Sequence, residues 1–547
     1  MVTPTRMAHY EEAVKHYSRA VEMRPNFALP YIYRGDIYRK MDKFDLAIDD
    51  YTEAIFWTRQ PARAYHGRGM AHGAKGDIDK AIEDFTKAIQ YEPDYAEAYY
   101  HRGNSYVIKD ELDRAIEDCD KAIQLNPDTA DAYLVRGNAY SSKGELDFAV
   151  MDYSKAIRLK PDSTDAYVFR GNAYSSKDEV DKAITDYTKA LELKPNYTDV
   201  YVIRGHVHLL KGDFDSAIAD CNKVMELRPD AADPYITRAT AYSLKGDFDS
   251  AITDCNGAVE RNPNAADAYL ILGMAFSNKN DFDSAIANYT EAIKLQPNYL
   301  NAHYERGNTY SSRGDLNEAI ADYTKVIRHV PNHIECYFSR GVAYNEKGHF
   351  DKAIADYTMV LKFQPDHIPS YVNRGNIYGT KGESDLAIAD YTMAIQLNPL
   401  MEISYYNRGS VYGNNGNFDM AIADFNMAIQ LNPRYTRAYY SRAKIWLHQR
   451  EWEKAKADLT DAKDMNVDIV VLFHNDYQSI PDFEKQIGVK LPDDITTLLM
   501  QQKEKTRTQS VEENLFRPSS EIDRRSFEKI AEMRAQQARS NPTAIHI

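Results

Sequence analysis

Glycine residues recur at a fixed spacing through most of this 547-residue chain. Eleven of them lie 34 residues apart or at a multiple of 34: Gly35, Gly69, Gly103, Gly137, Gly171, Gly205, Gly273, Gly307, Gly341, Gly375 and Gly409. Ala239 and Ala443 occupy the two remaining places, so thirteen segments follow one another without an insertion. With this residue set as position 8, the segments run from Ala28 to Ile469. A chain built in this way stacks one unit on the next instead of enclosing a single globular core.

Other positions keep the same period and predict helices. Position 4 is Tyr in every repeat except at His303, position 20 is Ala in all thirteen, and position 24 is mostly Tyr or Phe. The spacings 4, 8, 11 and 20, 24, 27 place these residues on one face of each of two short helices. Position 15 is Gly, Asp or Asn in twelve repeats and position 32 is Pro in eleven, which ends each helix. The small residues at positions 8 and 20 predict a close approach of the two helices.

This pattern resembles the tetratricopeptide repeat family. One repeat shows it through the following residues: Tyr133, Arg136, Gly137, Tyr140, Ala149, Tyr153 and Pro161. The resemblance covers about four-fifths of the chain. It implies an all-α fold, a right-handed superhelical solenoid of antiparallel helix pairs that binds peptides or proteins in a concave groove.

Two positions depart from the family pattern together. Position 7, usually Leu in the family, is Arg in twelve repeats, and position 23 is Asp in twelve. The single repeat without the Arg, at Leu272, is also the one without the Asp, at Asn288. This covariation predicts an ion pair between the two helices of each repeat, as in Arg136–Asp152 and Arg170–Asp186. The alternative is that both positions are separate solvated surface residues.

The ends of the chain differ from the repeats. Residues 1–27 match a second helix without its first, because Ala13 and Tyr17 align with Ala47 and Tyr51. This orphan helix either caps the array or follows a truncated start, and we favour truncation because an unpaired second helix would expose apolar surface. Residues 470–505 carry apolar residues spaced for one or two helices that cap the last repeat. Residues 506–547 form a polar tail with one expected helix, Glu521 to Ala538.

Composition and motifs argue against several classes of function. The net charge of −15 disfavours binding to nucleic acids or anionic membranes. No apolar run is long enough to span a membrane and no signal peptide is apparent, which favours the cytoplasm. The four cysteines form no metal-binding or disulfide pattern, and His72, His208 and His303 occupy aromatic positions, so we expect core-edge histidines. Since no catalytic motif occurs, we predict no catalytic residues, no metal and no cofactor.

The resemblance places candidate binding residues on the first helix of each repeat, where positions 2, 5, 9, 12 and 13 face the groove in the family. Position 9 is Asn at Asn104, Asn138, Asn172, Asn308 and Asn376, and we expect these amides to point into solvent and to bind the backbone of an extended peptide. Position 5 is apolar or aromatic, as at Tyr100, and the strongest expected anchors are Tyr304 and Phe338. The alternative is that Asn and Ser merely solvate the inner helices. Family members that grip a terminal carboxylate carry Lys at position 5, and no repeat here does.

Three functions compete at this point. The first is a scaffold or adaptor that binds a protein or peptide. The second is the substrate-selecting arm of an enzyme, glycosyltransferase-like, whose catalytic part is absent or encoded separately. The third is a structural spacer, against which the apolar residues at position 5 argue, since we expect them to be exposed. The sequence leaves the partner and the oligomeric state open.

Overall fold

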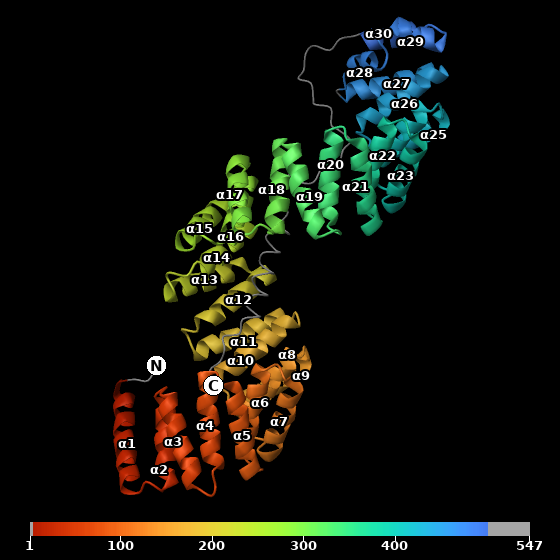
Figure 1. Ribbon diagram of the computed structural model, residues 1–547. Helices are drawn as coiled ribbons and strands as arrows, with labels where there is room; N and C mark the ends of the chain where they lie inside the picture. The colour runs from red at the N-terminus through yellow and green to blue at the C-terminus, as the bar shows by residue number, and fades with distance from the viewer. Residues whose placement is uncertain (1–3, 466, 501–547) are drawn as a thin grey trace. The chain divides into compact units, whose positions relative to one another are not determined.

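The computed structural model describes residues 4–465 and 467–500, which contain thirty α-helices and no strand (Figure 1). The chain divides into two compact units, one ending at Pro263 and the other beginning at Asn264. Each unit is built from consecutive antiparallel helix pairs that follow the 34-residue repeat. The thirteen predicted pairs are therefore confirmed. The expected helix Glu521–Ala538 lies outside the described residues.

The first helices of the repeats are α2 (Ala28–Lys40), α4 (Ala62–Lys75), α6 (Ala96–Ile108), α8 (Ala130–Ser142), α10 (Thr164–Ser176), α12 (Thr198–Lys211), α14 (Asp233–Lys245), α16 (Ala266–Asn278), α18 (Leu300–Arg313), α20 (Ile334–Glu346), α22 (Ile368–Thr380), α24 (Glu402–Asn414) and α26 (Thr436–Gln449). The second helices are α3 (Phe44–Trp57), α5 (Ile78–Tyr91), α7 (Leu112–Leu125), α9 (Leu146–Leu159), α11 (Val180–Leu193), α13 (Phe214–Leu227), α15 (Phe248–Arg261), α17 (Phe282–Leu295), α19 (Leu316–His329), α21 (Phe350–Phe363), α23 (Ser384–Leu397), α25 (Phe418–Leu431) and α27 (Trp452–Asp464).

The turn inside each repeat uses a left-handed residue at position 15. All thirteen residues at this position have φ between +58° and +92°. Twelve are Gly, Asp or Asn, which tolerate this conformation at little cost. The thirteenth is Arg450, with φ of +63°, which the sequence pattern did not identify. Its guanidinium donates to the carbonyl of Ile487, so a contact with the C-terminal segment accompanies the strained backbone.

The glycine at position 8 makes room for the aromatic ring at position 24. A Cβ atom on Gly137 would lie 2.6 Å from Cε1 of Tyr153, closer than side chains tolerate. The two repeats with Ala at position 8 carry smaller side chains at position 24, Cys255 and Leu459. Glycine is therefore needed where a ring lies on the first helix, whereas alanine occurs in two repeats that lack this ring.

Two glycine substitutions test this packing rule. Gly137→Ala should destabilise its repeat by about 1–3 kcal/mol, because the added methyl overpacks the ring of Tyr153. Gly205→Ala is the matched control, since position 24 is Cys221 there and the nearest atom to an added Cβ is 3.5 Å away. It should be neutral or stabilise by up to about 1 kcal/mol through helix propensity. Urea midpoints measured by circular dichroism compare the two, and equal losses would contradict the rule.

An arginine at position 7 and an aspartate at position 23 form a two-pronged ion pair within twelve repeats. Nε and Nη2 of each guanidinium donate to the two carboxylate oxygens at 2.6–2.9 Å. The predicted pairs Arg136–Asp152 and Arg170–Asp186 are among them. The aspartate side chains are only 2–10% exposed. They are thus interior groups and not solvated surface residues.

The same guanidinium also reaches the preceding repeat. Its Nη1 donates to the residue at position 25 of that repeat, as Arg170 does to Ser154 and Arg408 to Thr392. In repeat 1 the acceptor is Ser18 of α1 (Pro4–Met23), so the orphan helix takes the place of a preceding second helix. Rings at positions 4 and 11 pack beside the cation, with Tyr167 and Tyr174 near Arg170. Each arginine therefore joins three helices.

A second row of ion pairs is more exposed. A Lys or Arg at position 14 contacts the aspartate at position 18 of the preceding repeat in at least eight places among the described residues, as in Lys177–Asp147. The side chain of Asp147 is 87% exposed, so solvent screens the attraction. We expect this outer row to contribute little to stability in comparison with the buried row.

Loss of a carboxylate should destabilise the protein much more in the buried row of ion pairs than in the exposed row. Asp186→Ala should lower the local unfolding free energy by about 3–5 kcal/mol, because it leaves the Arg170 guanidinium half-buried without its carboxylate. Asp147→Ala, the exposed control in the neighbouring repeat, should cost about 0–1 kcal/mol. Native-state hydrogen exchange of the α10 and α11 amides measures the local unfolding free energy of each variant. A local measurement is appropriate because each repeat of an array contacts only its neighbours. Similar losses in the two variants would show that burial does not set the strength of the inner row.

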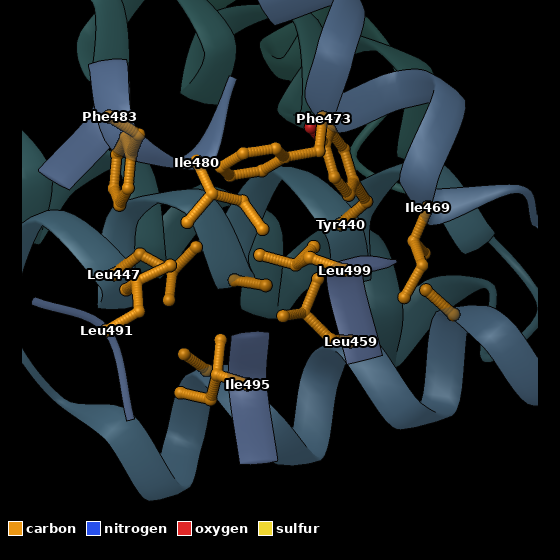
Figure 2. Close-up of a cluster of buried hydrophobic side chains, with 13 residues drawn as sticks. Tyr440, Leu447, Leu459, Ile469, Phe473, Ile480, Phe483, Leu491, Ile495 and Leu499 are labelled. Atoms are coloured by element: carbon orange, nitrogen blue, oxygen red, sulfur yellow. The ribbon is translucent and has the colours of Figure 1, made fainter. Parts of the chain in front are cut away.

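Three short helices cover the last repeat, where the sequence predicted one or two. They are α28 (Ile469–Asp476), α29 (Ile480–Ile487) and α30 (Asp493–Met500). Their buried residues Phe473, Phe483 and Ile495 pack on α26 and α27 (Figure 2). The third helix was missed because Pro492 and the acidic pair that follows it interrupt the apolar pattern over only eight residues.

Candidate functional site

The expected aromatic anchors are packed within their repeats. Tyr100 is 8% exposed, and Tyr304 and Phe338 are half-buried. The ring of Tyr304 lies 5.3 Å from His333, and that of Phe338 lies 5.0 Å from His367, centroid to centroid. The expectation of exposed apolar side chains at position 5 was therefore wrong, because these rings fill the space between the first helix and the end of the repeat.

Four of the five asparagines at position 9 take part in a hydrogen bond inside their own repeat. Oδ1 of Asn138, Asn172, Asn308 and Asn376 accepts the hydroxyl of the tyrosine at position 24, at 2.7–2.9 Å. Asn104 lies in a repeat with Cys119 at that position and lacks this bond. These amides are half-buried structural groups on the inner surface. The expectation that they project into solvent was wrong, because the tyrosine hydroxyl needs an acceptor.

A hollow of about 870 Å³ opens in the second unit, on the first helices of three consecutive repeats. Its walls come from α20, α22 and α24, and its edges from Leu316 and Phe350 at the start of two second helices. Gly379, at position 12 of α22, leaves the wall without a side chain. Of the predicted binding residues, only Asn376 lines this hollow; Asn104, Asn138, Asn172, Asn308, Tyr100, Tyr304 and Phe338 do not.

Amide side chains dominate the polar lining. Asn345, Asn376 and Asn407 are spaced by 31 residues and cross the three helices diagonally. Oδ1 of Asn376 accepts from Nδ2 of Asn407 at 3.0 Å and from the hydroxyl of Tyr391 at 2.7 Å. These bonds fix the orientation of the central amide before any ligand arrives. The 31-residue spacing is present in the sequence. It differs from the 34-residue period, so these asparagines occupy different repeat positions and a comparison by repeat position does not group them.

The hollow is nearly free of charge. Glu346 is its single charged lining residue, and the remaining polar groups include Thr380, Ser410 and Asn414. Tyr406 and Val411 add apolar wall. A mixture of fixed amides, hydroxyls and apolar patches suits an uncharged, extended chain that offers alternating backbone donors and acceptors.

The four cysteines and the histidines at position 11, which could act as nucleophiles or metal ligands, lie in the core or at its edge. The four cysteines are free and buried, and among the described residues no three His, Cys, Asp or Glu side chains converge as around a metal ion. His72 and His208 lie 3.5 and 3.4 Å from Asp77 and Asp213 at the turns of their repeats. No helix in the described part of the chain could cross a membrane.

His303 replaces the usual tyrosine at position 4 and supports an ion pair. Its Nδ1 lies 2.8 Å from Oδ1 of Asp322, which also accepts from Arg306. Burial alone would raise the pKa of Asp322, but hydrogen bonds from Arg306 and His303 outweigh it and hold that pKa below its ordinary value. This carboxylate therefore stays ionised in the interior.

Comparison with known proteins identifies the repeats. The tetratricopeptide repeat profile matches residues 96–129, 164–197, 300–333, 334–367, 368–399 and 403–435, and related profiles of the same repeat match 73–110, 137–178, 198–231, 232–265 and 273–312. The chain belongs to the tetratricopeptide repeat family. No curated protein gives a significant match.

Several solved structures are similar over part of the chain. MamA is 35% identical over 29% of this chain and 94% of its own, with a TM-score of 0.27. The APC/C hetero-tetramer Cut9–Hcn1 is 17% identical over 80% of this chain and 94% of its own, at 0.34. YrrB, a TPR protein with an unusual peptide-binding site, is 24% identical over 33% and 93%, at 0.28. Because each TM-score is below 0.5, nothing about partners follows from these neighbours.

Two buried histidines in repeats 2 and 3 predict a loss of stability in acid. Burial, with a smaller contribution from the charge of Arg39, lowers the pKa of His66 to about 3 and that of His101 to about 4. The rings lie 5.1 Å apart, so each protonation also opposes the other. The unfolded chain takes up protons below about pH 6.5, where the folded chain does not, so folding weakens as pH falls from 6.5 towards 4.

We expect this effect to reach a few kcal/mol, at about 1.4 kcal/mol for each unit of pKa difference. Thermal melts of the parent and of His101→Leu between pH 7 and pH 4.5 measure it. The variant should lose less stability than the parent over this range. Parallel pH dependence in both proteins would mean that His101 does not carry the effect.

Proposed function

We propose that this chain is a protein-interaction scaffold that binds an extended peptide segment on the inner surface of repeats 10–12. The observation that carries the proposal is the hollow lined by α20, α22 and α24, with its diagonal of Asn345, Asn376 and Asn407. Carboxamides offer both a donor and an acceptor, which matches the backbone of an extended chain. Family membership supports the role, since tetratricopeptide repeat proteins are generally scaffolds for protein–protein contacts.

Hydrogen bonds to the backbone of a bound peptide do not distinguish one peptide sequence from another, so specificity requires contacts with the side chains of the peptide. Tyr406, Phe350 and Val411 supply apolar wall between the amides, and Gly379 leaves space for a side chain of the ligand. The prearranged Asn376–Asn407 bond lowers the cost of ordering the site on binding. We propose that the peptide lies across the three first helices, and the role requires no catalysis by this chain.

A substitution that fills the hollow with a side chain tests the proposed binding site. Gly379→Leu places a side chain in the cavity, and an added Cβ meets nothing closer than Val411 Cγ2 at 3.7 Å, so the fold should persist. Gly73→Leu is the matched control, at the same repeat position outside the hollow, with an added Cβ 3.8 Å from Ala81. A phage-displayed library of random dodecapeptides, selected on the parent, should give peptides that bind Gly73→Leu equally and Gly379→Leu at least tenfold more weakly.

Two further variants locate the ligand. Asn345→Ala with Asn414→Ala should weaken the selected peptides about tenfold or more, because each neutral hydrogen bond contributes about 1 kcal/mol. A triple change of Asn104, Asn138 and Asn172 to Ala should leave these peptides bound. It should also lower the melting temperature slightly, since Tyr153 and Tyr187 lose their acceptors. Failure to enrich any peptide, or undiminished binding to Gly379→Leu, would contradict the proposed site.

A further inference from the structure

The outward surface of the second helices changes character in repeats 10–12. Position 26 is Lys in repeats 2–6 and 9, but it is Met359, Met393 and Met427 in repeats 10, 11 and 12. Positions 19, 26 and 30 share one face of a helix, because they are spaced by seven and four residues. In repeats 11 and 12 all three are apolar; they are Leu386, Met393 and Leu397 on α23 and Met420, Met427 and Leu431 on α25.

These side chains are accessible to solvent. Leu386, Met393 and Leu397 are 49%, 38% and 39% exposed, and Met420 is 52% exposed. Between Leu386 and Leu400 the sole charged residue is Asp390, and between Met420 and Pro433 it is Asp424. Both aspartates are buried in ion pairs with arginines. In a protein with 27% charged residues, an uncharged outer surface of this extent marks an interaction site.

The two apolar stripes lie on neighbouring helices. The guanidinium of Arg408 bonds both Thr392 on α23 and Asp424 on α25, so one side chain holds the two helices together. Met393 directly follows Thr392 in the chain. The stripes and the seam between them form one surface, which we call the methionine face (Leu386, Met393, Leu397, Met420, Met427 and Leu431; Figure 1 shows α23 and α25).

Charges at one edge of the methionine face are uncompensated. In at least eight repeats of the described chain the aspartate at position 18 is paired with a Lys or Arg at position 14 of the next repeat. Asn415 and Gln449 occupy that place for Asp385 and Asp419. Among the described residues, these two carboxylates have no ion-pair partner, and both are exposed. A partner with basic residues along one flank would complement them.

We propose that the methionine face binds an amphipathic α-helix of a partner protein, with apolar residues against the face and Lys or Arg beside Asp385 and Asp419. The face exposes side chains of two helices and no unpaired backbone groups, so a bound strand would leave its own donors and acceptors unsatisfied, whereas a helix satisfies them internally. Methionine side chains adapt to the shape of such a ligand. This site lies on the second helices and is separate from the inner hollow.

The size of the face favours a single helix over a second copy of this chain. A surface of six partly exposed Leu and Met side chains offers on the order of 300–600 Å², typical of the largest patch on a monomer. A stable dimer buries about 800 Å² on each partner. The stripe from Leu386 to Leu397 is roughly 17 Å long at a rise of about 1.5 Å per residue, which is about three turns of a bound helix.

The test uses the full chain and a labelled 18-residue peptide with Leu at i, i+3, i+4 and i+7 spacing and Lys on the opposite face. Fluorescence anisotropy should show that Leu386→Gln with Met420→Gln weakens binding at least tenfold. The control is Leu46→Gln with Phe148→Gln, which removes exposed side chains at the same repeat position where position 26 is Glu53 or Lys155. The control should change affinity less than twofold, and equal effects or no binding to the parent would overturn the proposal.

Three further measurements separate the alternatives. Asp385→Asn with Asp419→Asn should weaken binding of the Lys-containing peptide and leave the affinity of a Gln-substituted peptide unchanged. Unchanged affinity for both peptides would contradict the proposed contact between basic residues of the partner and these two aspartates. Sedimentation equilibrium should show that Leu386→Gln with Met420→Gln does not alter the association state; dissociation of a dimer would identify a second copy as the occupant. Phe527→Glu in the C-terminal segment should leave peptide affinity unchanged, and a rise would mean that this segment covers the face.

Discussion

The arginine at position 7 is the interaction on which the stacking of the repeats depends. It bonds the carboxylate at position 23 of its own repeat and the polar side chain at position 25 of the preceding one, so a single cation joins a first helix to two second helices. The hydrogen bonds that Arg170 donates to the Asp186 carboxylate raise the pKa of Arg170, which keeps the guanidinium charged in a half-buried setting. Because the partners are fixed at three places, the helices have little freedom to slide or rotate. The repeat without this arginine, at Leu272, is the first complete repeat of the second unit, which begins at Asn264.

This fixed arrangement determines what the surfaces can vary. The buried residues at positions 7, 8, 20, 23 and 24 set the geometry, while positions on the inner and outer surfaces change from repeat to repeat. In repeats 10–12 the inner surface gains asparagines and loses bulk at Gly379, and the outer surface exchanges lysines for Met359, Met393 and Met427. Repeats 11 and 12 thus contribute to both proposed binding surfaces, the hollow through their first helices and the methionine face through their second helices. A scaffold of this kind could hold an extended segment and a helix at one place along the array.

The period of 34 residues predicted the fold, the thirteen helix pairs and the ion pairs between positions 7 and 23, but it did not predict that these pairs are buried. The period could predict these features because each unit contacts only its neighbours, so a contact made in one repeat recurs in the others. The covariation of Leu272 with Asn288 indicated the pairing of positions 7 and 23, and the distances agree. The exposure of the inner surface was predicted wrongly. Residues such as Asn138 and Phe338 lie on the expected side of the helix, but a tyrosine hydroxyl and a neighbouring ring already occupy them.

The sequence by itself therefore determined the local interactions, since helix spacing, turn residues and paired charges act within one repeat or between adjacent ones. Only the tertiary structure decided that α20, α22 and α24 line a hollow, because a cavity depends on how side chains from three helices meet around Gly379. It also decided that Arg408 links α23 and α25, the two helices that carry the exposed apolar stripes. The repeats have nearly the same sequence pattern, and the sites differ because side chains of neighbouring repeats pack together differently. Such packing cannot be deduced from the sequence of one repeat alone.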